Sequence, residues 1–576
     1  MKYFLIQTRR LEGSGHPPIA LLEDAGLRSQ ITQIFGSMNL LQLFDGDKDK
    51  GSDDGDEHRS VIGQSGESGP ALRRTLGLYD GLGVLVGIMI GSGIFASPGV
   101  ALERCGSPGM SLMVWFGAGT LVMISSFNYM ELAAMHPSAG GDFSFIKRAY
   151  GDDAAFCFAW YNFWVSKTGS QAIIATIFGQ YLTWLVGGGE IGGASVMSKV
   201  FGVTLTVLLA VVNCMGIRES SNLQNVLTVI KLLLIFMVFI AGMVYASASP
   251  DTLEHNFAGD SAFEGTKGFG FFTGMVAALW AFDGWADLNF MAEELIDPTR
   301  NIPKVLGGGL MLVTVAYILA NVAYLAVLDK GDIAGASAIA IDFGYTTGGE
   351  IYGAAAAAVL ALGVAVATAG SENGSIMTGG RAFMAVARVG HAPRVFSRLN
   401  AAGAPSAALA AQCIWTCVLI LLPGSSFSAL LDYFGPVSWM FYSITSSCVI
   451  KLRWSEPDTP RPFTVPWYPL PPIITAAVAV CIMVSSLVTK PLFTSLALGF
   501  CGLALPVRWL VKSLEEPAPQ GGGGLRWSKV NEGEVGDEAD TELTGRDMDV
   551  LSGLQRGLEE EHGHDGTDQS APLGAV

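Results

Sequence analysis

Residues 87–95 of the chain read GIMIGSGIF, and residues 280–285 read WAFDGW. Both stretches interrupt long apolar segments with residues that weaken a helix. The first places Gly91 and Gly93 on either side of a serine, and glycine destabilises a helix interior by about 1 kcal/mol relative to alanine. The second places an aspartate and a glycine in the same kind of segment. We therefore predict local breaks in two helices, and these breaks decide how the rest of the sequence is interpreted.

The composition indicates a protein that crosses a membrane many times. Half of the 576 residues are hydrophobic and 15% are charged, whereas a typical soluble protein carries about 25% charged residues. Apolar windows of the ~20 residues needed to cross a bilayer predict twelve transmembrane helices. Every span should be helical, because an open sheet edge cannot be satisfied in lipid. The windows cover residues 79–101, 108–135, 154–184, 199–216, 222–247, 268–294, 304–328, 348–378, 405–423, 427–450, 468–488 and 491–512.

The distribution of charge predicts the domain boundaries and the topology. The formal net charge of −17 divides into −4 in residues 1–72, −2 in residues 73–512 and −11 in residues 513–576. The two acidic ends are predicted to be disordered tails around a membrane domain. With a cytoplasmic N-terminus, the cytoplasmic loops hold sixteen Lys and Arg residues and the opposite loops five. This bias follows the positive-inside rule and places both tails in the cytoplasm. The chain has no basic face for nucleic acid.

The two predicted breaks lie five helices apart, in windows 1 and 6. This spacing is typical of carriers built from two inverted repeats, here windows 1–5 and 6–10. We expect each break to free N–H groups where its outer half-helix begins, and these suit a carboxylate. Carbonyls freed at the end of the preceding half-helix suit an ammonium, so the pattern predicts a zwitterionic amino acid near the midplane. Helix packing through Gly83, Gly87 and Gly91 is the alternative for the first break. A tie between Asp283 and a neighbouring helix or lysine is the alternative for the second.

The chain contains the motifs GSGIF (91–95), SPG (107–109), YMEL (129–132), SAGGDF (138–143), QNVLTVIK (224–231), FDGWADLNF (282–290), EEL (293–295), RNIP (300–303), GSENGS (370–375) and GGR (379–381). In this order, they resemble the L-type amino-acid transporters, the light subunits of heteromeric amino-acid transporters in the amino acid–polyamine–organocation superfamily. The resemblance implies an all-α membrane protein of 12 transmembrane helices in a 5+5 inverted repeat (LeuT-like), with discontinuous helices 1 and 6. It also implies obligate exchange of amino acids.

The resemblance assigns residues to a substrate site. Ser92 and Gly93 would hold the substrate carboxylate through backbone N–H groups. Trp280 would gate the site from outside, and the carbonyls of residues 281–283 would face the amino group. The apolar members suit a large neutral side chain, whereas Asp283 favours a cationic one, so large neutral, small neutral and cationic substrates all stay open. The expected substrate-binding set is Ile90, Gly91, Ser92, Gly93, Ile94, Trp280, Ala281, Phe282, Asp283, Gly284 and Ser438.

The resemblance also assigns Lys231 to the place of a sodium ion in related sodium-coupled carriers. Its ammonium is expected near backbone oxygens around Gly87 and the hydroxyl of Ser371 or Ser375, which predicts transport without sodium. Snorkelling of the lysine to the interface is the alternative. Glu372 stands where the family usually has an apolar residue. It would favour cationic substrates, carry a coupled proton, or pair with Lys231 or Lys167. Lys167 itself would serve as a structural anchor or as a substrate contact.

No catalytic, cofactor or metal site is expected, because none of the seven histidines lies mid-span or at ligand spacing from cysteines or carboxylates. The loop at about residues 187–198 lacks the cysteine through which light subunits bond to a heavy subunit, which argues against a disulfide-linked heavy subunit. The leading interpretation is a sodium-independent amino-acid exchanger in the plasma membrane that works by alternating access. The alternatives are a proton-coupled amino-acid symporter and an amino-acid sensor with little transport.

Overall fold

The computed structural model describes residues 72–187, 195–257, 262–336, 338–422 and 427–515. Almost all of both predicted tails lies outside these ranges. The described residues up to Leu514 belong to one compact unit. Within the described ranges the chain contains helices and no strand, apart from an isolated bridge between Leu76 and Leu295. The prediction of an all-α protein is therefore confirmed.

The helices follow the apolar windows along the chain. The α-helices are α3 (Leu78–Met89), α4 (Gly93–Cys105), α5 (Pro108–Met135), α6 (Asp142–Tyr150), α7 (Asp152–Tyr161), α8 (Thr168–Gly187), α9 (Val196–Met215), α10 (Ile217–Ala248), α11 (Asp251–Phe257), α12 (Gly270–Ala281), α13 (Pro298–Val327), α14 (Lys330–Gly335), α15 (Ile339–Arg388), α16 (Ser406–Leu421), α17 (Phe427–Ser455), α18 (Leu470–Thr489), α19 (Pro491–Gly502) and α20 (Ala504–Glu515). A π-helix, η2 (Asn162–Lys167), and two 3-10 helices, η4 (Asp287–Met291) and η5 (Arg394–Ser397), complete the set.

Seven of the described helices are long and apolar enough to cross a bilayer, or eight if the bent pair of α3 and α4 counts as one span. Each of the twelve predicted windows falls on one or more described helices. Some of these helices, such as α12 and α16, are apolar but too short to count among those that could cross a bilayer on their own. Large apolar side chains also cover the outside of α10, where Leu233 is 62% exposed and Phe236 is 59% exposed. Such a surface suits lipid rather than water.

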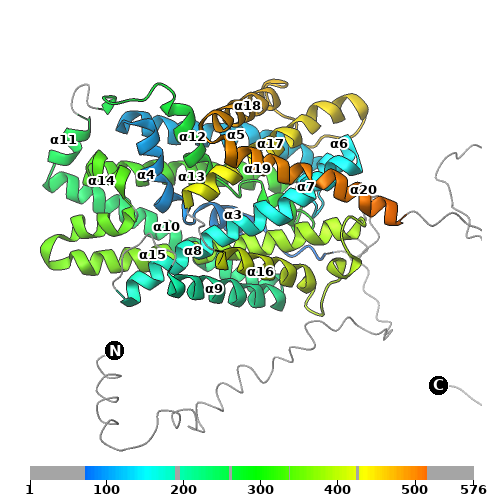
Figure 1. The fold of residues 1–576 in the computed structure, drawn as a ribbon, viewed down its shortest axis with the longest axis horizontal. Helices are drawn as coiled ribbons and strands as arrows, with labels where there is room; N and C mark the ends of the chain where they lie inside the picture. The colour runs from blue at the N-terminus through cyan, green and yellow to red at the C-terminus, as the bar shows by residue number, and fades with distance from the viewer. Residues whose placement is uncertain (1–71, 188–194, 258–261, 337, 423–426, 516–576) are drawn as a thin grey trace, which may run out of the picture. The chain divides into compact units, whose positions relative to one another are not determined.

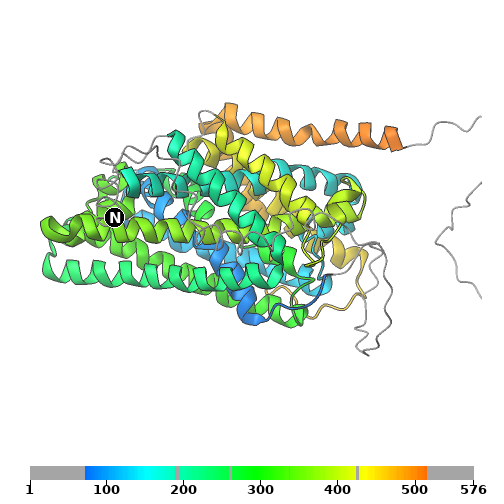
Figure 2. The ribbon, with the colours of Figure 1, turned by 90° about the horizontal axis from the view of Figure 1, so that it is seen from below.

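The interrupted helix α3–α4 lies inside the bundle, in contact with α12, α13 and α15 (Figure 1). Its two halves meet at an angle of 43°. Figure 2 shows α19 and α20 along one edge of the same bundle, away from these breaks. The interior around the breaks is therefore formed by helices that are far apart in the sequence.

A buried ion pair joins α15 to the segment that follows η4. Arg381 on α15 binds Glu294 with an N–O distance of 2.5 Å, and both side chains are almost fully buried. The pair lies close to the chain entering α3, since Glu294 also accepts the backbone N–H groups of Thr75 and Leu76 through its carbonyl oxygen. Removal of one partner would leave a buried charge without compensation.

Candidate functional site

The first break leaves backbone donors free at the start of α4. Helix α3 ends at Met89, and the N–H of Gly91 turns back to the carbonyl of Met89 at 2.9 Å. Helix α4 starts at Gly93. Within the described residues, the N–H groups of Ser92, Gly93 and Ile94 donate to no acceptor. Such donors at a helix N-terminus, with the helix dipole behind them, form a site for an anion.

The second break leaves backbone acceptors free after α12. This helix ends at Ala281, Gly284 adopts a φ of +89°, and the short helix η4 follows. The carbonyl oxygens of Phe282 and Asp283 accept no hydrogen bond from any described residue. The N–H groups of Trp285 and Ala286, just before η4, also donate to no described acceptor, so both breaks free backbone donors as expected. The second break offers carbonyls, which suit an ammonium.

The two breaks touch each other closely. A Cβ atom built on Gly93 would lie 2.6 Å from the Cα atom of Ala281, and one built on Gly284 would collide with the side chain of Ile88. Only glycine fits at these positions, which accounts for the glycine in each motif. The hydroxyl of Tyr317 on α13 lies 2.5 Å from the carbonyl oxygen of Met89 and 2.8 Å from that of Ala281. Tyr317 thus bridges the carbonyl ends of both half-helices.

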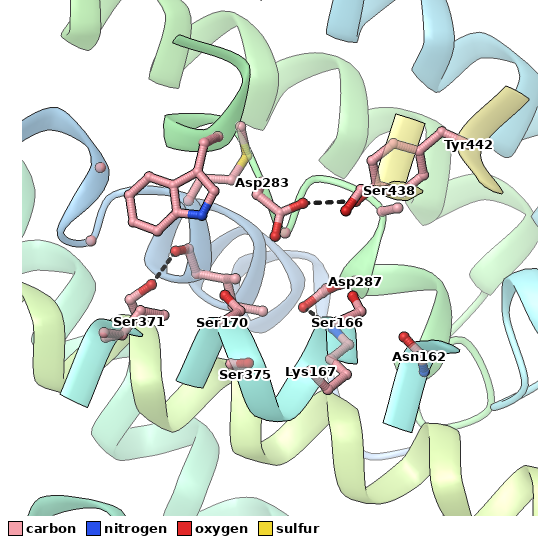
Figure 3. Close-up of a pocket in the computed structure, with 18 of the residues that line it drawn as sticks. Asn162, Ser166, Lys167, Ser170, Asp283, Asp287, Ser371, Ser375, Ser438 and Tyr442 are labelled. Carbon is pink, nitrogen blue, oxygen red and sulfur yellow. Dashed lines mark hydrogen bonds and ion pairs between the residues drawn. The ribbon is translucent and has the colours of Figure 1, made fainter. Parts of the chain in front are cut away.

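A cavity with an empty volume of about 730 Å³ lies beside the two breaks (Figure 3). Its wall is rich in polar side chains, including six serines, three aspartates and one lysine. The lining residues are Ile88, Met89, Gly91, Ser92, Gly93, Asp142, Phe158, Tyr161, Asn162, Ser166, Lys167, Ser170, Ile174, Trp280, Ala281, Asp283, Gly284, Ala286, Asp287, Phe290, Ser371, Ser375, Ser438, Phe441 and Tyr442.

The structure brings most of the predicted substrate residues to this cavity. Eight of them line it, together with two of the residues predicted for the cation site. They are Gly91, Ser92, Gly93, Trp280, Ala281, Asp283, Gly284 and Ser438, with Ser371 and Ser375. The carboxylate of Asp283 accepts a hydrogen bond from the Tyr442 hydroxyl on α17 at 2.8 Å, so it is tied to a neighbouring helix while it faces the cavity.

Three predicted residues of the side-chain pocket lie elsewhere. Ile90 and Ile94 are fully buried and do not line the cavity. Phe282 turns toward the opposite side, where its ring centroid lies 4.9 Å from that of Tyr317 and 6.4 Å from that of Trp115. The aromatic side of the cavity includes Trp280, as predicted, together with Phe441 and Tyr442 on α17.

Lys231 points into the bundle and not toward an interface. Its side chain is fully buried, and its ammonium donates to the carbonyl oxygen of Gly87 at 2.5 Å. The expected backbone contact near Gly87 is thus present, and snorkelling is not. The expected serine contacts differ, since the hydroxyl of Ser371 donates to the carbonyl of Ile88 and that of Ser375 accepts from Gln171.

Glu372 faces away from the cavity and makes no ion pair with any described residue. It lies about 100° around α15 from Ser371 and accepts a hydrogen bond from Thr206 on α9 at 3.2 Å. Its second carboxylate oxygen is buried without a partner among the described residues. The expected pairing with Lys231 or Lys167 is therefore wrong, and Glu372 does not add a second carboxylate to the site near Asp283.

Several polar residues of the cavity wall are absent from the predicted site. One is Asp287 of the FDGWADLNF motif, which forms an ion pair with Lys167. Asp142 accepts hydrogen bonds from Tyr129 and from Thr445, the latter at 2.8 Å. An acidic residue inside a span is itself a signal of function, and Asp287 could have been found that way. Among the described residues, no group of three or more His, Cys, Asp or Glu side chains could hold a metal ion.

Comparison with known proteins agrees with this geometry. Residues 76–498 match the family model described as amino acid permease. The chain is 33% identical over 463 residues to "Large neutral amino acids transporter small subunit 2" of Homo sapiens, covering 79% of this chain and 84% of the relative. It is 31% identical over 423 residues to "b(0,+)-type amino acid transporter 1" of Mus musculus, covering 73% of this chain and 84% of the relative. The resemblance inferred from the motifs is confirmed. This multi-pass membrane protein belongs to the amino acid permease family, and it is an amino-acid transporter and not an enzyme.

Proposed function

We propose that the chain is a sodium-independent exchanger of L-amino acids with twelve spans, a 5+5 inverted repeat and alternating access around the cavity. The contact between the Lys231 ammonium and the Gly87 carbonyl carries the proposal, because it places a fixed positive charge one turn before the first break. A fixed charge at this point takes the place that a bound sodium ion would fill. The carrier then has no need of a sodium gradient.

The two breaks suit the two charged ends of an α-amino acid. The free N–H groups of Ser92, Gly93 and Ile94 would bind the substrate carboxylate, and the free carbonyls of Phe282 and Asp283 would bind its ammonium. Each backbone group at these breaks is desolvated by the surrounding helices, so a substrate that completes the missing hydrogen bonds gains affinity.

The cavity wall supports both neutral and cationic substrates. Asp283 receives a hydroxyl hydrogen bond from Tyr442, but no described cation pairs with it. An ammonium or guanidinium on the substrate side chain would supply that charge, whereas a neutral side chain would lie against Trp280 and Phe441.

Uptake by the purified full-length protein in proteoliposomes tests the proposal. Radiolabelled leucine, alanine and arginine would be offered with and without sodium, and with and without unlabelled amino acid inside. We expect equal uptake in sodium and sodium-free buffers, and strong stimulation by internal amino acid. A strict sodium requirement would exclude the role given to Lys231, and uptake indifferent to internal substrate would exclude exchange. Saturable binding without uptake would favour the amino-acid sensor.

Glu372 favours a second candidate, a proton-coupled symporter. Its carboxyl is fully buried and one of its oxygens has no partner among the described residues, so it could bind and release a proton. Uptake would then rise with an inward proton gradient, and Glu372→Gln would abolish that dependence. A pH profile shared by wild type and this variant would exclude Glu372 as the proton carrier.

The chain is further proposed to work without a disulfide-linked heavy subunit. One relative is named a small subunit, but the loop at residues 187–198 contains no cysteine; most of this loop lies outside the described residues. A single band at the monomer mass on non-reducing gels is expected, and a reductant-sensitive complex would contradict it. The distribution of Lys and Arg supports cytoplasmic termini, and the plasma membrane is the proposed location.

A further inference from the structure

The cavity wall contains more negatively than positively charged side chains. Lys167 is the one cation among the described lining residues, and it faces three carboxylates, Asp142, Asp283 and Asp287. It forms its ion pair with Asp287, and the two side chains are only 8% and 9% exposed (Figure 3). Asp283 and Asp142 receive hydrogen bonds from hydroxyl groups, which carry no charge.

Local structure fixes Lys167 in this position. Lys167 is the last residue of the π-helix η2, and single π-helical turns of this kind often occur at functional sites. Its ammonium also contacts the Thr378 hydroxyl on α15 at 3.4 Å and lies 5.0 Å from the ring centroid of Phe290. Thr378 in turn donates to Asp287 at 3.2 Å. The ion pair therefore joins η2, η4 and α15 at one point of the wall.

A buried ion pair is weak evidence for a role in stability, because desolvation offsets much of the attraction between the charges. This pair differs from the other buried pairs, such as Arg381–Glu294, because both partners line the cavity. A substrate side chain in the cavity therefore experiences the combined charge of Lys167 and Asp287. At the short distances within such a site, one uncompensated unit charge is enough to change which side chains bind.

We propose that the Lys167–Asp287 ion pair sets the charge selectivity of the transporter. By neutralising Asp287, Lys167 limits the negative charge of the wall, so that neutral side chains are accepted together with cationic ones. Asp283 then remains as the carboxylate nearest the breaks that attracts a cationic side chain. This inference rests on the proposed binding of amino acids in the cavity.

Four variants assayed by proteoliposome uptake of arginine, leucine and glutamate test the inference. Lys167→Gln frees Asp287, and we expect the arginine-to-leucine uptake ratio to rise on the order of tenfold. Asp287→Asn frees Lys167, and the same ratio should fall by a similar factor while glutamate gains. The double variant Lys167→Gln/Asp287→Asn should return the ratio toward that of wild type. Glu456→Gln breaks a surface ion pair with Arg148 and serves as the matched control.

The opposite signs of the two single variants separate selectivity from support of the fold. A pair that serves only as an anchor would lower uptake of all three substrates alike, and unchanged ratios in both single variants would overturn the inference. If Asp287→Asn does not fold, Lys167→Gln and the double variant still decide, because only charge selectivity predicts a raised ratio in the first and its reversal in the second. Failure of wild type to transport any amino acid would instead refute the proposed function.

Discussion

Substitution of Gly93 by alanine would force the two breaks apart. The added Cβ atom would lie 2.6 Å from the Cα atom of Ala281 and 2.8 Å from its Cβ atom, whereas ordinary van der Waals contact begins at 3.4 Å. The shortfall of 0.8 Å (3.4 minus 2.6) falls on backbone, which cannot rotate away as a flexible side chain can. Overpacking of this kind costs about 1–3 kcal/mol. If the strain is relieved by separating the breaks, substrate affinity should fall about 5- to 150-fold, since 1.4 kcal/mol is a factor of ten.

The assay is saturation uptake by reconstituted wild type, Gly93→Ala and Gly308→Ala. Gly308 on α13 has open space around its Cα atom, so the added methyl group meets nothing within 4 Å. Alanine there should leave the Michaelis constant unchanged, because it only favours the helix. We expect Gly93→Ala to weaken uptake of neutral and cationic substrates by the same factor, since it disturbs the backbone groups that we propose bind the ends common to both. Wild-type affinity in Gly93→Ala at normal expression would refute the role given to the close crossing.

Three further predictions concern positions outside the cavity. Tyr317→Phe removes the donor that bridges two buried carbonyls, so a loss of about 1–3 kcal/mol in the free energy of unfolding is expected, measured by thermal unfolding in detergent. Arg381→Met leaves the buried carboxylate of Glu294 unpaired, which should cost about 3–5 kcal/mol; adding Glu294→Gln should recover part of the loss. Burial and the nearby arginine cation lower the pKa of His391 to about 4, so the unfolded chain gains a proton first and stability should fall as the pH drops from about 6.5 toward 4. His391→Gln should reduce this decline, and an identical pH profile would contradict it.

Sequence reasoning located the breaks because they depend on local chemistry. Glycine at positions 91, 93 and 284, and an aspartate within an apolar window, weaken a helix wherever they occur. The contact between Lys231 and Gly87 was predicted in a different way. The family resemblance supplied the pairing of these distant helices, and the structure has this contact. Predicting the breaks and the Lys231 contact requires no knowledge of side-chain directions inside the bundle.

The missed features depend on side-chain direction in three dimensions. Ile90, Ile94 and Phe282 lie next to the break residues in sequence, but their side chains do not line the cavity. Glu372 is adjacent to Ser371 in sequence, yet the helical rotation of about 100° per residue directs it toward α9. The extra width of a π-helical turn at Lys167 has no reliable signature in a single sequence.

In the proposed mode of binding, two kinds of group recognise the substrate, and substitutions of each kind should have different effects. The free N–H groups after the first break and the free carbonyls after the second belong to the backbone, so every amino acid meets the same donors and acceptors. The charges of Asp283, Asp287 and Lys167 belong to side chains, so they meet only the part of the substrate that varies. Substitutions that separate the breaks should therefore lower the affinity for all substrates by the same factor. Substitutions of the charged wall should instead change the order of preference among substrates. If a glycine variant changed the order of preference, or a charge variant lowered the affinity for all substrates equally, backbone groups and charged side chains would not have these separate roles.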